Sequence, residues 1–147
     1  MSDAVIEIRR AKSSDIPNVA AAERSYIDCP WNEKQIGDEL TKDNSLFFVA
    51  TVGDEFAGYL SAVRAADECE IANIAVVDSY RRKGVATKLL HSLINEAANL
   101  GVRSFFLLVG EHNESARRLY EKIGFTEVGR RKRYYGINDA LSMRLQV

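Results

Sequence analysis

The sequence contains little cysteine and no excess of charge of either sign. Its 147 residues include two cysteines, Cys29 and Cys69, which are too few and too far apart to indicate a disulfide framework or a zinc site. The net charge of −1 gives no general attraction to nucleic acid or to an anionic membrane. We therefore expect no metal site, no direct nucleic-acid partner and no membrane partner.

Long apolar runs, linkers and repeats are also missing. The apolar runs are far shorter than a membrane span, and the opening stretch MSDAVIEIRR lacks the apolar segment of a secretory signal. No low-complexity tract, internal repeat or linker rich in proline, glycine and serine divides the chain. These absences predict a single domain over residues 1–147 in a reduced, cytoplasmic compartment.

What the sequence does contain is an alternation of strand-like and helix-like segments. Strands are expected at residues 5–10, 45–52, 56–65, 68–77 and 102–109, followed by two strand-like stretches around residues 136–139. Helices are expected at residues 13–27, 86–100 and 113–123, with a short helix after Asn32. The nearly continuous apolar run VRSFFLLV indicates a central strand. The pattern predicts an α/β fold with a mixed sheet.

Three consecutive cationic residues lie between a predicted strand and a predicted helix, in the stretch RRKGVATKLL at residues 81–90. A helix start already presents unpaired N–H groups and the positive end of the macrodipole. Arg82 and Lys83 add full charges, and Gly84 would let a ligand approach the backbone closely. The stretch fits a receptor for a phosphate or pyrophosphate group, and it fits a solvated basic turn equally well. It is not a Walker loop, and no G-x-G-x-x-G occurs in the chain.

Two motifs in the chain resemble the GNAT N-acetyltransferases. R-x-x-G-x-A at residues 81–86 resembles the acetyl-CoA pyrophosphate signature, and V-x-x-x-N-x-x-A-x-x-L-Y-x-x-x-G-F at residues 109–125 resembles the second motif of that family. The stretches CPWNEK, NIAV, RRKRYY and DALSM further resemble the RimI type of ribosomal-protein alanine acetyltransferase. The resemblance covers nearly the whole chain. It implies the GNAT fold, a mixed and mostly antiparallel central sheet flanked by helices, with acetyl-CoA as co-substrate and no metal.

The resemblance assigns cofactor contacts by position. One strand segment matches the strand whose backbone pairs with the amide-bearing arm of acetyl-CoA: Ile74, Ala75 and Val76. The pyrophosphate loop is matched by Arg82, Lys83, Gly84, Val85, Ala86 and Thr87. Asn113 matches a residue that touches the cofactor arm, although it also suits a plain helix N-cap, and one asparagine could serve both roles.

The same resemblance assigns the proton-transfer groups. Tyr120 matches the general acid that would protonate the departing CoA thiolate, and the competing interpretation is that it only packs. The RimI family has a glutamate as general base where this chain has Leu108. Glu70 is the substitute we predict, because on a regular strand it would share a face with Ile74 and Val76. A solvent-facing carboxylate is the equal alternative for Glu70, and two weaker candidates for the base are Glu111 and His112.

The missing glutamate favours an α-amine acceptor over lysine. At pH 7 an α-amine with a pKa of ~7.8 is roughly 14% neutral, whereas a lysine with a pKa of ~10.4 is about 0.04% neutral. An α-amine therefore tolerates a weak base far better. The expected acceptor is the amino-terminal alanine of a small-subunit ribosomal protein, gripped by Trp31, Tyr134 and Tyr135, which could instead be core aromatics. Two alternatives stay open: a GNAT enzyme for a small-molecule amine or lysine, and a CoA-binding module without turnover.

Overall fold

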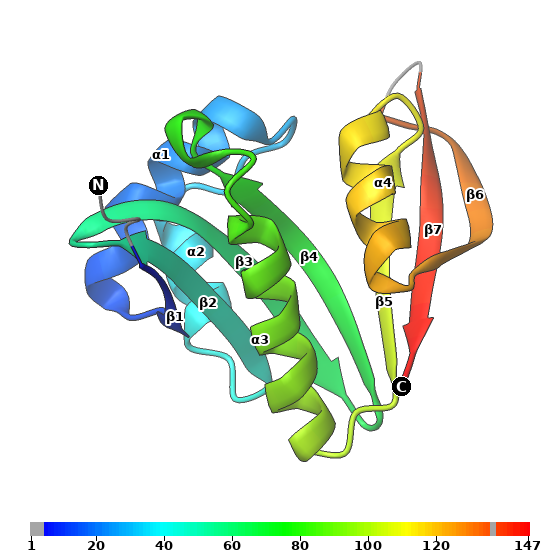
Figure 1. Cartoon of the computed structure of the whole chain (residues 1–147), viewed down its shortest axis with the longest axis horizontal. Helices are drawn as coiled ribbons and strands as arrows, with labels where there is room; N and C mark the ends of the chain where they lie inside the picture. Colours follow the sequence, from blue (N-terminus) through cyan, green and yellow to red (C-terminus); the bar gives the residue numbers. More distant parts are fainter. Residues whose placement is uncertain (1–4, 136–137) are drawn as a thin grey trace.

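The computed structural model describes residues 5–135 and 138–147, which form one seven-stranded sheet covered by helices on both faces (Figure 1). The helices are α1 (Ile16–Tyr26), α2 (Glu33–Leu40), α3 (Val85–Asn99) and α4 (Glu114–Ile123), with single 3₁₀ turns at Ser13–Asp15 and Asp78–Tyr80. The strands are β1 (Ile6–Arg10), β2 (Ser45–Val52), β3 (Glu55–Ala65), β4 (Glu68–Val76), β5 (Ser104–Gly110), β6 (Thr126–Tyr135) and β7 (Asn138–Gln146).

The sheet is mixed and mostly antiparallel, as predicted. The strand order is β1-β2-β3-β4-β5-β7-β6, and the β4–β5 pair is parallel while every other neighbouring pair is antiparallel. Most predicted elements are present with shifts of one or two residues at their ends, which is the usual uncertainty of helix and strand limits. The first helix begins three residues later than predicted, at Ile16, because residues 13–15 form a 3₁₀ turn. The turn of the last hairpin, at residues 136–137, lies outside the described residues.

Two buried clusters hold the helices against the sheet. On one face, α3 and α4 pack through residues such as Leu89, Leu93 and Tyr120 against apolar side chains of the strands. On the other face, α1 and α2 pack through Val19 and Ile36. Each helix supplies the side chains that recur every three or four residues, which explains why the helical periodicity is readable in the sequence.

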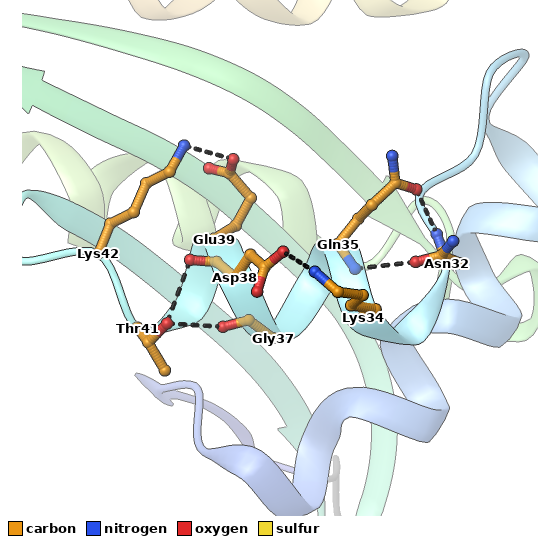
Figure 2. Close-up of polar contacts among 8 residues, drawn as sticks. All are labelled: Asn32, Lys34, Gln35, Gly37, Asp38, Glu39, Thr41 and Lys42. Carbon is orange, nitrogen blue, oxygen red and sulfur yellow. Dashed lines mark hydrogen bonds and ion pairs between the residues drawn. The ribbon is translucent and has the colours of Figure 1, made fainter.

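Helix α2 is capped at both ends by side chains. The Oδ1 of Asn32 accepts a hydrogen bond from the backbone N–H of Gln35 at 2.8 Å, and the Oε1 of Gln35 accepts one from the N–H of Asn32 at 2.9 Å. At the other end the Thr41 hydroxyl donates to the carbonyl of Gly37 at 3.0 Å. Figure 2 shows these contacts along α2. The reciprocal cap fixes the point at which the chain enters α2.

Among the described residues, no helix is long and apolar enough to cross a membrane.

Candidate active site

Strands β4 and β5 part from each other halfway along their length. Within the described chain, their pairing runs from Glu68–Ser104 to Ile71–Leu107 and ends there. Beyond that point β4 continues to pair with β3, and β5 continues to pair with β7. Figure 1 shows the two strands diverging, with α3 on one side of the opening and α4 on the other. The backbone of β4 from Asn73 onward therefore has an edge that no neighbouring strand of the described sheet covers.

A β-bulge in β4 precedes the uncovered edge. Asn73 pairs with Ser61 and Ile71 pairs with Ala62, so Ala72 is an extra residue in the strand. Cys69 and Ile71 belong to the buried cluster under α3, and Ile74 and Val76 pack against the same cluster. The bulge thus changes which alternate residues face α3.

The predicted grouping of Glu70 with Ile74 and Val76 on one face is wrong because of this bulge. Glu70 points away from α3, to the side on which Ala75 is buried beneath α1 and α2. It is exposed and pairs with Phe106, just before the strands part. Leu108 lies two residues further along β5, and its neighbours Leu107 and Val109 belong to the cluster under α3, so Leu108 faces the same side as Glu70.

The predicted cofactor strand uses its side chains for the core. Ala75 is buried against the α1–α2 face, while Ile74 and Val76 pack under α3. Only the backbone of this segment is left for a ligand at the uncovered edge, which is the role that the resemblance assigns to it.

The turn at residues 81–84 places cationic residues next to the first backbone N–H groups of α3. Arg82 and Gly84 both have positive φ, 63° and 84°, and Gly84 is the N-cap without any side chain to satisfy the first N–H groups. The first N–H groups of a helix have no partners within the helix, and they are a common binding site for anions. No atom lies within 4 Å of a Cβ placed on Gly84, so the approach to this backbone is open.

The three cations of the turn have different surroundings. Arg81 is held by the fold: its Nε donates to the Val76 carbonyl at 3.2 Å, it pairs with Asp78 at 3.3 Å, and its guanidinium lies over the Tyr26 ring. The side chains of Arg82 and Lys83 are exposed, with the Lys83 ammonium 5.9 Å from the ring centre of Tyr80. They can therefore turn to a bound anion.

The first three residues of α3 differ in burial. Val85 is buried at 1% exposure, whereas Ala86 and Thr87 are half-buried. All three lie in the first turn of the helix, so their N–H groups point out of its N-terminus.

On the other side of the opening, α4 presents Tyr120 and Asn113. Tyr120 is buried at 6% exposure, and its ring meets Phe125 edge-on at 5.9 Å between centres. It lies in the same cluster as Val109 of β5. Asn113 is the N-cap of α4, with its Oδ1 accepting from the N–H of Ala116 at 3.3 Å. The capping role predicted for Asn113 is therefore confirmed.

The carboxylate of Glu111 is already engaged in hydrogen bonds within the protein. It accepts from the Arg130 guanidinium at 2.6 Å and from the N–H of Asp139 at 3.2 Å. The hydrogen bond from Arg130 holds the pKa of Glu111 below its usual range, which makes this carboxylate a poor base. His112 is exposed, and its ring lies over the backbone of Gly110.

The predicted acceptor residues come from two segments on either side of the opening. Trp31 lies between α1 and α2 and is partly buried against their cluster. Tyr134 of β6 is 51% exposed, with the Arg131 guanidinium 5.8 Å from its ring centre. Tyr135 ends β6 and pairs with Asn138 through the backbone, and its side chain lies outside the described part of the structure. Trp31 and Tyr134 are thus not fully enclosed core aromatics.

Sequence reasoning missed one polar residue beside these segments. Glu23 of α1 is fully buried at 0% exposure. Its Oε1 accepts from the backbone N–H of Trp31 at 2.7 Å, and its Oε2 accepts from the Asn73 amide at 2.9 Å and from the Tyr59 hydroxyl. Burial, together with the neighbouring carboxylate, raises the pKa of Tyr59 far above its usual range. The available signal was spacing, because Glu23 follows Val19 by four residues and so lies on the apolar face of its helix.

A cavity of about 460 Å³ lies elsewhere, between α1, the start of β3 and the loop after β4. Its walls include Tyr26, Phe56 and Tyr80, and none of the predicted site residues lines it. The candidate site is therefore defined by the parting of β4 and β5 and not by this cavity.

The sequence and the overall fold both match known proteins. Residues 7–125 match the acetyltransferase (GNAT) family. The chain is 32% identical over 144 residues to the ribosomal protein bS18-alanine N-acetyltransferase of Escherichia coli, covering 95% of this chain and 97% of the relative. The crystal structure of the ribosomal-protein-S18-alanine N-acetyltransferase from Escherichia coli superposes with a TM-score of 0.90 at 31% identity, over 97% of this chain and 94% of that one. That of Ard1 from Thermoplasma volcanium superposes with a TM-score of 0.91 at 25% identity, over 97% of each chain. The chain belongs to the GNAT family of acetyltransferases.

Proposed function

We propose that this enzyme transfers the acetyl group of acetyl-CoA to the α-amine of a protein amino terminus, and that its acceptor is the amino-terminal alanine of a small-subunit ribosomal protein. The observation that carries the proposal is the opening between β4 and β5, which has a cationic turn at one side and Tyr120 at the other. The bS18-alanine N-acetyltransferases, similar over nearly the whole chain, support the choice of acceptor. Donor and acceptor would meet in the cytoplasm.

The donor would bind along the uncovered edge of β4. The turn formed by Arg82, Lys83 and Gly84, together with the first N–H groups of α3, would hold the pyrophosphate. The backbone of residues 74–76 would bond the amide-bearing arm, because these peptide groups lack a partner strand on that side. Asn113 would touch the same arm while it caps α4.

Two groups on opposite faces of the sheet would serve proton transfer. When the amine nitrogen bonds to the acetyl carbon and the carbon–sulfur bond breaks, Tyr120 would donate its phenolic proton to the thiolate. Glu70 faces the other side, and Leu108 occupies the position of the family's glutamate on that same side, about two residues along the neighbouring strand. An amine that enters from this side would give its proton to Glu70 directly or through water.

Glu70→Gln tests that assignment. The substitution keeps the size of the side chain and removes its basicity, so we expect the acid limb of the kcat/KM pH profile to change and kcat to fall. The matched control is Glu68→Gln, a carboxylate near the start of the same strand. A pH profile that is unchanged in Glu70→Gln would exclude Glu70 as the base.

The acceptor would enter between the α1–α2 connection and the β6–β7 hairpin. Trp31 and Tyr134 would form the walls of a slot for the first few residues of an extended peptide. An alanine at the first position would leave the α-amine free to reach the thioester, because its side chain is small.

A panel of acceptors distinguishes this function from its two alternatives. We expect CoA release with an Ala-initiated peptide, no release when its α-amine is blocked, and little transfer to internal lysines. Faster turnover on spermidine or on a lysine ε-amine would instead establish the small-molecule or lysine activity. Acetyl-CoA binding without CoA release on any amine would establish a binding module without turnover.

A further inference from the structure

Glu23 is a buried carboxylate, and its three hydrogen-bond donors among the described residues are uncharged. They are the Trp31 backbone N–H, the Asn73 amide and the Tyr59 hydroxyl. Removing a carboxyl group from water is unfavourable unless its hydrogen bonds offset the lost hydration. An apolar side chain would fill the same volume at lower cost. A carboxylate at this position therefore has a role that depends on the groups to which it is hydrogen-bonded.

The donors to Glu23 belong to both sides of the proposed active site. Trp31 lies in the connection between α1 and α2, on the acceptor side. Asn73 follows the bulged Ala72 on β4, at the start of the edge where acetyl-CoA would bind. Because one carboxylate accepts from both, it sets the position of the acceptor wall relative to the cofactor strand.

Residues 31–32, here called the Trp31 segment, are held by hydrogen bonds at both positions. The N–H of Trp31 bonds to Glu23 at 2.7 Å, and the next residue, Asn32, enters the reciprocal cap of α2 (Figure 2). The indole itself is only partly buried. Its orientation therefore depends on how the backbone is held.

We infer that Glu23 is a positioning residue for the acceptor, which holds the Trp31 segment in register with Asn73 so that an incoming amine meets the thioester at the correct angle. The inference rests on the proposed function, in which Trp31 lines the acceptor slot.

Glu23→Gln tests the inference with little change of shape. The glutamine amide replaces one accepting oxygen by a donor, so at least one of the three partners loses its acceptor. We expect the KM for an Ala-initiated peptide to rise about tenfold and the KM for acetyl-CoA to stay within about twofold. A peptide KM within about twofold of the wild-type value in folded Glu23→Gln would overturn the inference.

Tyr59→Phe is the matched control, because it removes one donor from Glu23 and leaves the bonds to Trp31 and Asn73. It should lower Tm, since a buried hydrogen bond is lost, while the peptide KM stays within about twofold. A rise in peptide KM equal to that of Glu23→Gln would mean that any loss of stability in this region has the same effect, and would also overturn the inference.

Fluorescence gives a second readout that does not depend on turnover. Trp31 is the single tryptophan of the chain, so its emission reports the acceptor wall alone. In Glu23→Gln we expect a red shift and stronger acrylamide quenching, which Leu93→Ala, a destabilising change under α3, should not produce. Unchanged Trp31 emission in Glu23→Gln would contradict the proposed positioning.

The two proposals fail in different ways. If the wild-type enzyme acetylates no amino-terminal peptide, the proposed function is wrong. If it does and Glu23→Gln leaves peptide KM unchanged, only the role of Glu23 is wrong. Should Glu23→Gln not fold, Asn73→Ala removes a single donor and is expected to give the same preferential rise in peptide KM.

Discussion

Tyr120 is the residue whose hydroxyl the proposed reaction requires, and Tyr120→Phe isolates that hydroxyl. The phenylalanine ring would keep the edge contact with Phe125. We expect kcat to fall by roughly one to three orders of magnitude, the range for a lost general acid. The measurement is steady-state CoA release with a saturating Ala-initiated peptide.

Tyr59→Phe again serves as the control, because it removes a buried hydroxyl outside the opening between β4 and β5. It should reduce kcat far less than Tyr120→Phe does. Intact turnover in Tyr120→Phe would show that Tyr120 only packs.

The turn before α3 has two properties that substitutions can separate, namely its positive charge and the positive φ of its glycine. Gly84→Glu adds a negative charge where the N–H groups and cations would hold pyrophosphate, and we expect it to abolish acetyl-CoA binding by calorimetry. The fold itself has room for the side chain, because nothing lies within 4 Å of the Cβ position, although the φ of 84° remains strained for any residue with a Cβ.

Gly53→Glu is the matched control for this strain. Gly53, in the turn between β2 and β3, also has positive φ, 62°, and open space around its Cβ position. The control variant should lose a similar amount of stability and keep its affinity for acetyl-CoA. Undiminished affinity in Gly84→Glu would contradict the placement of the pyrophosphate.

For the whole molecule, ion pairs with arginine predict a loss of stability in acid. Arg130 joins Glu111 at the end of β5 to Asp139 on β7, and its hydrogen bonds hold the pKa of both carboxyls below their usual values. Burial alone would raise the pKa of Asp15. The hydrogen bonds from Arg9 and from the Lys12 backbone have the larger combined effect, so the pKa of Asp15 is also lowered. A lowered pKa in the folded state stabilises the protein above the unfolded pKa, near ~4, and this contribution is lost as the pH falls through the folded value.

We therefore expect the urea midpoint to be nearly constant from about pH 7 to pH 5 and to fall below about pH 4. Arg130→Gln should fall less steeply, because Glu111 and Asp139 then titrate closer to their unfolded values. Arg118→Gln, which breaks an exposed pair with Glu114, is the control and should follow the wild-type curve. Parallel acid curves for the wild type and Arg130→Gln would contradict the role given to this cluster.

The opening between β4 and β5 is also a property of the whole molecule. Strand β4 stays with β3 and strand β5 stays with β7, so the two halves of the sheet keep their own partners and their own covering helix while they diverge. No single element contains the site.

The secondary-structure elements, and the parts of the site that depend on local structure, could be predicted from the amino-acid sequence. The apolar face of α3, the cationic turn with its glycine and the N-cap Asn113 all follow from neighbours within a few residues, where periodicity, φ preference and capping act. The tertiary structure alone decided the rest. The bulge at Ala72 follows from the pairing of β4 with β3, and it turns Glu70 to the opposite face from the one predicted. The burial of Glu23 likewise depends on Asn73, which lies 50 residues away in the chain. Local patterns carry no information about such contacts, because the free energy that favours them comes from pairing and desolvation between segments that meet only when the chain has folded.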